Sequence, residues 1–155
     1  MNQAIISNSA EETAHIAQKT ANQIHEQKLP QIFCLSGPMG AGKSVFARAF
    51  IRHMMNDNNL EVPSPTFTLL QQYEASSQTL WHFDLYRLEE ADEIYELGWE
   101  EAISQTNAKN ILLIEWPERL GILRPSCYTD IKITPINEAL REITINVINE
   151  TNKNI

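Results

Sequence analysis

The chain has 155 residues and carries 12 Lys plus Arg against 20 Asp plus Glu, which gives a formal net charge of −8 at pH 7. This length suffices to bury a core without disulfides or structural metal, and it predicts a single domain over residues 1–155. The negative charge argues against unaided binding to a polyanion, so any role with nucleic acid is expected to be indirect.

Neither targeting nor membrane insertion is expected from the sequence. Residues 1–9 have no basic or apolar region of a secretion signal. The longest apolar runs, such as 111–114, are far too short to span a bilayer. Cys34 and Cys127 are isolated from each other, which is typical of reduced thiols. We therefore expect a cytoplasmic protein without a membrane partner.

The first half of the chain alternates strand and helix patterns. A short edge strand is predicted at 4–6, within residues 1–8, and Ser9 with Glu12 has the capping-box pattern that begins a helix ending near Glu26. Further elements are predicted as a strand at 31–35, a helix at 43–55, and strands at 66–70 and 80–85 that form a hairpin.

The second half mixes short helices with strands. Residues 92–103 are predicted as one or two helical pieces broken at Gly98, and 111–114 has the continuous apolar run of a central parallel strand. Alternating patterns predict strands at 128–134 and 142–148, which form an antiparallel edge. The polar tail 149–155 is expected to fray.

A complete phosphate-binding loop, Gly-Pro-Met-Gly-Ala-Gly-Lys-Ser, occupies residues 37–44 between a predicted strand and a predicted helix. Its glycines allow backbone N–H groups to point at phosphates, which also meet the positive end of the helix dipole. Lys43 is expected to reach the β- and γ-phosphates, and the Ser44 hydroxyl to bind Mg²⁺. The pattern predicts a nucleoside triphosphate site in an α/β, P-loop NTPase-like three-layer fold, with a mostly parallel central sheet and antiparallel edge strands. The loop residues expected to contact nucleotide are Met39, Gly40, Ala41, Gly42, Lys43 and Ser44.

Two acidic residues follow apolar strands, where ligands of open α/β sheets bind. Glu115 is a candidate to hold Mg²⁺ or a Mg²⁺-bound water, and the alternative is a solvated acid at a strand end. Asp84 is a candidate to polarise the attacking water or to support the metal, and the alternative is a turn-forming aspartate. Since no other His or Cys lies at metal-ligand spacing, His82 fits an exposed or satisfied strand histidine better than a ligand.

Three further residues each allow two interpretations. Thr66, between prolines and a strand, belongs either to a loop that closes over the γ-phosphate or to an ordinary proline turn. Arg87 is either an arginine finger or the partner of Glu89 or Glu90 in a surface ion pair. Trp116 either caps the sheet edge or contacts nucleotide or a partner protein.

Between about residues 12 and 141 the chain resembles the TsaE (YjeE) family. These are small bacterial ATPases of the machinery that installs threonylcarbamoyl on the adenosine next to the tRNA anticodon. The resemblance rests on motifs that occur in order at 37–44, 64–67 (Ser-Pro-Thr-Phe), 82–88 (His-Phe-Asp-Leu-Tyr-Arg-Leu), 96–98 (Glu-Leu-Gly) and 115–117 (Glu-Trp-Pro).

The resemblance implies roles for particular residues, with ATP or ADP and Mg²⁺ as cofactors. It implies catalytic roles for Lys43, Asp84 and Glu115, and Mg²⁺ ligation by Ser44 and Glu115. Thr66 matches a switch-loop residue, Trp116 a site-adjacent aromatic, Thr13 the segment near adenine, and Arg141 an arginine before the last strand. It further implies slow ATP hydrolysis alone, docking on the TsaB and TsaD transferase subunits, and contact with tRNA only through that complex.

The chain departs from the family pattern in the loop and just after it. Ser44 and Val45 replace threonines, and Pro38-Met39 replaces an acidic residue and Leu. Serine keeps the metal-binding hydroxyl, whereas Val45 lacks one phosphate contact. The alternative function is a small-metabolite P-loop kinase, although the scattered arginines do not suggest a lid. A GTP-driven switch is disfavoured, because 107–110 reads Asn-Ala-Lys-Asn rather than the guanine-reading Asn-Lys-x-Asp.

Overall fold

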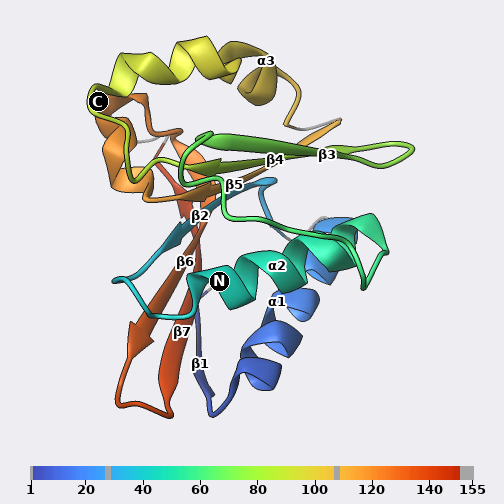
Figure 1. Ribbon diagram of the computed structural model, residues 1–155, viewed down its shortest axis with the longest axis vertical. Helices are drawn as coiled ribbons and strands as arrows, with labels where there is room; N and C mark the ends of the chain where they lie inside the picture. The colour runs from blue at the N-terminus through green and yellow to red at the C-terminus, as the bar shows by residue number, and fades with distance from the viewer. Residues whose placement is uncertain (1, 27–28, 107–108, 151–155) are drawn as a thin grey trace.

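The computed structural model describes residues 2–26, 29–106 and 109–150 (Figure 1). Within them, one seven-stranded sheet has the strand order β1-β7-β6-β2-β5-β4-β3. The predicted fraying of the tail concerns mostly residues 151–155, which lie outside the described part. The elements are β1 Asn2–Ser7, α1 Ala10–His25, β2 Ile32–Ser36, α2 Lys43–Met55, β3 Leu70–Glu74, β4 Thr79–Asp84, η1 Ala91–Leu97, α3 Trp99–Ser104, β5 Asn110–Glu115, η2 Pro117–Leu123, β6 Cys127–Pro135 and β7 Arg141–Asn149.

The centre of the sheet is parallel and its flanks are antiparallel, as predicted. Strand β2 lies parallel to both β5 and β6, and β4 lies parallel to β5. Strands β3, β7 and β1 each pair antiparallel with a neighbour. In the parallel register Asp84 is opposite Glu115, and Leu35 is opposite Glu115 on the other side. The carboxyl ends of β2, β4 and β5 therefore meet at one edge.

Helices cover both faces of the sheet and make the three layers that the sequence predicts. Figure 1 shows α1 and α2 on one face and α3 on the other. On the first face, Phe33 of β2 packs edge-on against Phe50 of α2, with ring centroids 5.0 Å apart. On the second face, Phe83 packs against Trp99 of α3 at 5.6 Å. These two buried clusters fix the sheet edge that carries the loop.

The two long helices begin at different signals. The Ser9 hydroxyl caps α1 by accepting from the Glu12 N–H at 3.1 Å. The Glu12 carboxylate accepts from the Asn8 N–H at 2.6 Å, one residue earlier than in a standard capping box. Helix α2 starts directly after Gly42, whose φ of 105° few other residues adopt. None of the helices in the described part is long and apolar enough to cross a membrane.

The predicted strand at 66–70 is wrong. Residues 66–68 form a turn, and strand β3 begins only at Leu70. The Leu69 N–H donates to the Pro65 carbonyl at 2.7 Å, and Leu69 has a φ of 67°, so the backbone curls before pairing can start. The predicted hairpin itself is confirmed, with Leu70 opposite Phe83. The segment η2 lies where the pattern predicts no element.

Candidate nucleotide-binding site

The loop between β2 and α2 encloses the side chain of its own lysine. Lys43 is only 8% exposed, and its Nζ donates to the Gly37 carbonyl and lies 3.5 Å from the Pro38 carbonyl. Burial lowers the pKa of Lys43, and the nearby Glu115 carboxylate opposes that shift. A Cβ on Gly37 would lie 2.5 Å from the Ile133 carbonyl oxygen, so this position of the loop requires glycine.

A cavity of about 320 Å³ opens beside the loop. It brings together the first turn of α2, the 64–66 turn and the ends of β4 and β5. Its lining includes nearly all residues that the sequence proposed for phosphate and metal chemistry. The lining residues are Met39, Gly40, Lys43, Ser44, Ser64, Thr66, Asp84, Tyr86, Arg87, Glu115 and Trp116.

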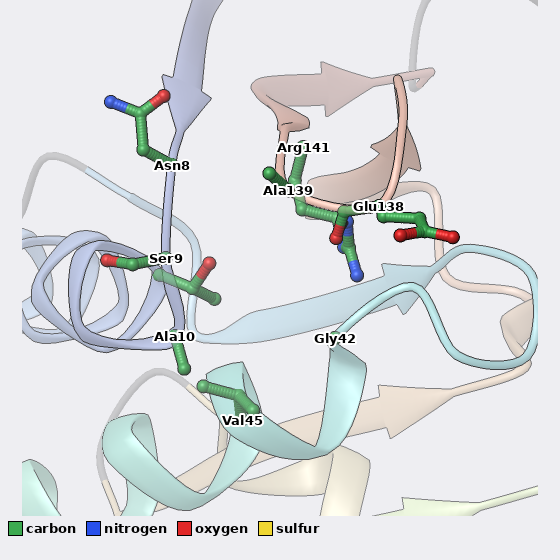
Figure 2. A pocket seen from close by; sticks show the side chains of 9 residues that line it. Asn8, Ser9, Ala10, Gly42, Val45, Glu138, Ala139 and Arg141 are labelled. Carbon is green, nitrogen blue, oxygen red and sulfur yellow. Dashed lines mark hydrogen bonds between the residues drawn. The ribbon is translucent and has the colours of Figure 1, made fainter.

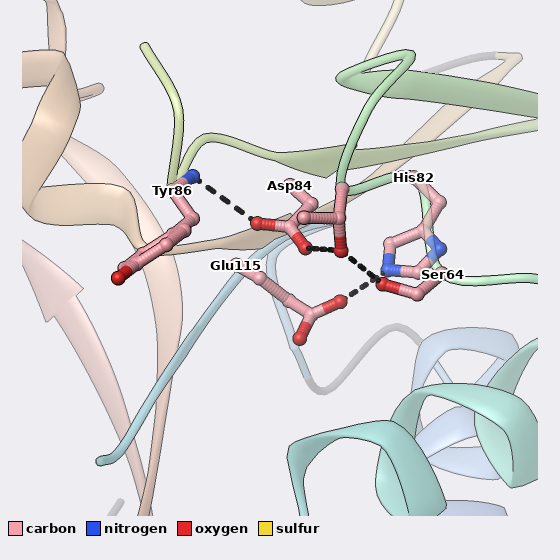
Figure 3. Close-up of polar contacts among 6 residues, drawn as sticks. Ser64, His82, Asp84, Tyr86 and Glu115 are labelled. Atoms are coloured by element: carbon pink, nitrogen blue, oxygen red, sulfur yellow. Dashed lines mark hydrogen bonds and ion pairs between the residues drawn. The ribbon is translucent and has the colours of Figure 1, made fainter. Parts of the chain in front are cut away.

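Asp84 is held at the end of β4 by two hydrogen bonds, which Figure 3 shows. One carboxylate oxygen accepts from the Thr66 hydroxyl at 3.2 Å and the other from the Tyr86 N–H at 3.1 Å. The Thr66 hydroxyl is in turn 2.7 Å from that of Ser64. The proline-flanked turn is thus tied through Thr66 to a carboxylate that is only 5% exposed.

The Glu115 carboxylate is hydrogen-bonded to the side chain of His82. Its Oε2 lies 2.7 Å from His82 Nε2, and the two side chains come from neighbouring strands β5 and β4 (Figure 3). Both residues are buried, Glu115 at 6% and His82 at 2% exposure. The His82 Nδ1 atom is also buried and has no partner in the described structure. His82 is therefore a strand histidine with one satisfied nitrogen, and the sequence carries no signal for its contact with Glu115.

Aromatic rings and cations border the same cavity. The Lys43 Nζ lies 4.0 Å from the centroid of the Trp116 ring, which packs against Tyr86 at 5.0 Å. The Arg87 guanidinium lies 4.2 Å over the Phe67 ring. The expected ion pair of Arg87 with a neighbouring glutamate is not among the contacts of the described residues. Trp116 lines the cavity, with a left-handed φ of 57°.

A second cavity, of about 230 Å³, also borders the start of α2 and has a different set of lining residues (Figure 2). Thr13 and Arg141 line this cavity together with Gly42 of the loop. Arg141 donates from Nε to the Ala41 carbonyl at 2.8 Å, across 100 positions of sequence. Sequence reasoning missed much of this lining, because the 138–139 turn has no motif of its own. The lining residues are Asn8, Ser9, Ala10, Thr13, Gly42, Val45, Glu138, Ala139 and Arg141.

The donor atoms in the first cavity suit a hard cation. Ser44 offers a hydroxyl and Glu115 a carboxylate, and both also line a small cavity of about 40 Å³ between α2, the 62–64 segment and strands β4 and β5. Oxygen donors of this kind fit Mg²⁺, which usually takes one or two carboxylates plus phosphate oxygens and water. The described residues contain no cluster of three or more His, Cys, Asp or Glu side chains suited to a metal ion.

The sheet order and the loop between β2 and α2 define an α/β protein of the P-loop fold. A crystal structure of Bacillus subtilis YdiB superposes with a TM-score of 0.69 over 96% of this chain and 86% of that one, at 24% identity. Residues 7–143 match the model of the family described as threonylcarbamoyl adenosine biosynthesis protein TsaE. The chain belongs to the TsaE family.

Curated relatives bear the same family name. The tRNA threonylcarbamoyladenosine biosynthesis protein TsaE of Rickettsia bellii is 38% identical over 150 residues, which cover 97% of each chain. The TsaE protein of Aquifex aeolicus is 32% identical over 141 residues, covering 91% of this chain and 93% of that protein. The similarity therefore extends over nearly the whole length of both proteins.

Proposed function

We propose that this protein is a Mg²⁺-dependent ATPase that serves tRNA threonylcarbamoyladenosine biosynthesis by acting on the TsaB and TsaD transferase subunits. Its membership of the TsaE family supports the place in that modification. The observation that supports the chemistry most is one cavity that gathers Lys43, Ser44, Asp84 and Glu115 from the loop and two strand ends.

In the proposed complex the triphosphate lies along the loop. The backbone N–H groups and the start of α2 face the phosphates, and Lys43 leaves the Gly37 carbonyl to bind the β- and γ-phosphates. Ser44 and Glu115 hold Mg²⁺, which when bound neutralises charge on the phosphate oxygens. Asp84 and the Thr66 hydroxyl orient the attacking water, because they are already hydrogen-bonded to each other at the same wall of the cavity.

The base occupies the second cavity. Gly42 and Val45 of this cavity are sequence neighbours of Lys43 and Ser44 in the first cavity, so an extended nucleotide can contact both cavities. Thr13 and Arg141 border the base, and Arg141 also fixes the loop through the Ala41 carbonyl. Its size of about 230 Å³ accommodates adenine; the sequence favours adenine only through the absence of a guanine-reading motif.

In this proposal, ATP hydrolysis changes how the protein contacts its partner proteins, and the contact surface lies beside the first cavity. Met39 and Phe67, which are 76% and 79% exposed, stand at the loop and at the 64–67 turn. We propose that the partner proteins cover these two side chains, because apolar surface that is contiguous and exposed marks interaction sites. The net charge of −8 also favours contact with tRNA through the transferase rather than directly.

The test is ATP hydrolysis by the purified protein with and without TsaB and TsaD, in Mg²⁺ and in EDTA. We expect slow Mg²⁺-dependent release of phosphate that rises when both subunits are present. The proposal fails if no phosphate is released under any of these conditions. A parallel incubation with labelled ATP and a metabolite extract separates the kinase alternative, since a kinase transfers label to a small molecule instead of to water.

A further inference from the structure

His82 is the buried group closest to the proposed metal ligand that the chemistry above does not use. It stands two residues before Asp84 in β4, on the same face of the strand, and its Nε2 reaches Glu115 Oε2 at 2.7 Å. Both partners are nearly excluded from solvent, at 2% and 6% exposure. A hydrogen bond in this setting is stronger and more directional than one at the surface.

The chemistry of the pair assigns the donor. A carboxylate only accepts hydrogen bonds, so the imidazole donates from Nε2 to Glu115. Nδ1 is buried without a partner among the described residues, and an unsatisfied buried polar atom destabilises a fold. An apolar residue here would avoid that cost, so the histidine is better explained by what it does for Glu115 than by stability.

We propose that His82 is a positioning residue for the Mg²⁺ site. Its Nε2–H holds Glu115 Oε2 and restricts the rotamers of this long side chain, which leaves Oε1 for the cation beside Ser44. The small cavity of about 40 Å³ that His82, Glu115 and Ser44 share places all three at one spot. The inference rests on the proposed function, because it assumes that Glu115 is the carboxylate that binds the metal.

The experiment measures how much Mg²⁺ strengthens ATP binding, taken as the ratio of calorimetric dissociation constants in EDTA and in saturating Mg²⁺. His82→Leu keeps the bulk and removes the donor, and we expect it to reduce that ratio roughly 10-fold while leaving ATP affinity in EDTA unchanged. His82→Gln restores a donor near the Nε2 position and should recover most of the ratio.

Thr129→Val serves as the matched control for lost packing. Thr129 is fully buried in β6 and its hydroxyl donates to the Pro30 carbonyl at 3.1 Å, outside the lining of all three cavities. If His82→Leu acts only by weakening the fold, Thr129→Val should reduce the ratio equally at matched thermal stability. That result would overturn the proposal.

A double variant separates this inference from the function on which it rests. Once Glu115→Ala has removed the carboxylate, adding His82→Leu should lower the ratio no further, since coupled residues are not additive. If Glu115→Ala alone leaves the ratio unchanged, the metal assignment in the proposed function is wrong. If Glu115→Ala collapses the ratio and His82→Leu does not, only the positioning role of His82 is overturned.

Discussion

The ammonium of Lys43 lies 4.0 Å from the centroid of the Trp116 ring, and it also donates to the carbonyl of Gly37 in its own loop. The indole face and the carbonyl together satisfy a cation that is only 8% exposed. A polyphosphate has to draw the lysine away from both. In the proposed complex, polyphosphate therefore replaces the Gly37 carbonyl and the Trp116 ring as the partners of Lys43, and we expect the Trp116 ring to lose its contact with the ammonium.

Lys43→Ala should abolish ATP binding, because no other side chain of the loop supplies a positive charge to the β- and γ-phosphates. Titration calorimetry with ATP and Mg²⁺ checks this result. Lys109→Ala is the matched control, since it removes the same charge just before β5, at the end of the sheet opposite to the loop. Wild-type heat of binding in Lys43→Ala would contradict the assigned loop chemistry.

Glu115→Ala should retain part of the ATP affinity but lose Mg²⁺-dependent turnover, since the loop still holds the phosphates while the metal lacks its carboxylate. Phosphate release in the reconstituted system with TsaB and TsaD measures the loss. Glu118→Ala is the control for charge alone, because Glu118 is exposed and lies outside the lining of the cavity. Normal turnover by Glu115→Ala would refute the metal assignment.

Thr66→Val should slow turnover about 10-fold or more with little change in ATP affinity. The substitution keeps the shape of the side chain but removes the hydroxyl that bonds Asp84 and Ser64. A hydrogen bond to a buried carboxylate contributes roughly 1.5–3 kcal/mol, and 1.4 kcal/mol in a barrier is tenfold in rate. Thr66→Ser restores the hydroxyl, so single-turnover rates of the two variants should differ. Equal rates would show that the turn acts through its backbone instead.

Arg141→Ala should weaken ATP binding, because the loop loses the Nε donor that holds the Ala41 carbonyl at 2.8 Å. Arg52→Ala is a close control, since Arg52 Nε makes a similar bond to the Leu60 carbonyl at 2.9 Å, away from both cavities. We expect both variants to lose stability in thermal melts and only Arg141→Ala to lose affinity. A parallel loss of affinity in Arg52→Ala would assign the effect to general loosening.

Asp130→Asn should stabilise the protein at neutral pH. Burial raises the pKa of Asp130 above its ordinary value of 3.8, and the charges of Arg124 and Lys132 offset part of the rise. The folded state thus holds this proton more tightly than the unfolded state does. The charged carboxylate therefore lowers stability as the pH rises from 3.8 through the raised pKa of the folded state, and the loss is complete above that pKa. We expect a rise in Tm of about 2 °C at pH 7. The difference should vanish as the pH falls below 3.8; an equal rise there would refute the assignment.

Sequence motifs and hydrophobic periodicity predicted those elements whose structure depends mainly on residues close in sequence. The loop, the strand before it and the apolar run ending at Glu115 carry their own periodicity or motif, and the sheet places them as expected. The turn at 66–69 was missed, because β-branched and aromatic residues favour a strand while one bond from Leu69 N–H to the Pro65 carbonyl decides otherwise. Tertiary structure overrides propensity in such short segments.

Parts of the site depend on contacts between distant residues, for which a single sequence gives no signal. His82 and Glu115 are 33 positions apart, and no motif or spacing in the sequence indicates that their side chains are in contact. The lining at Glu138 and Ala139 is likewise set by the β6–β7 hairpin and not by a motif. Asp84 and Thr66 were proposed separately, and only the structure joins them by a hydrogen bond.

The pairing of β1 with β7 sets when the second cavity can be completed during synthesis. The strand that leads to Thr13 is held in the sheet by the strand that begins with Arg141, which in turn braces the loop at Ala41. Because synthesis proceeds at about 5–20 residues per second, these segments leave the ribosome several seconds apart or more. A nascent chain that already contains the loop therefore still lacks part of the second cavity's wall. If the base occupies the second cavity as proposed, we expect nucleotide to bind tightly only after the last hairpin has docked, and not to serve as an early folding template.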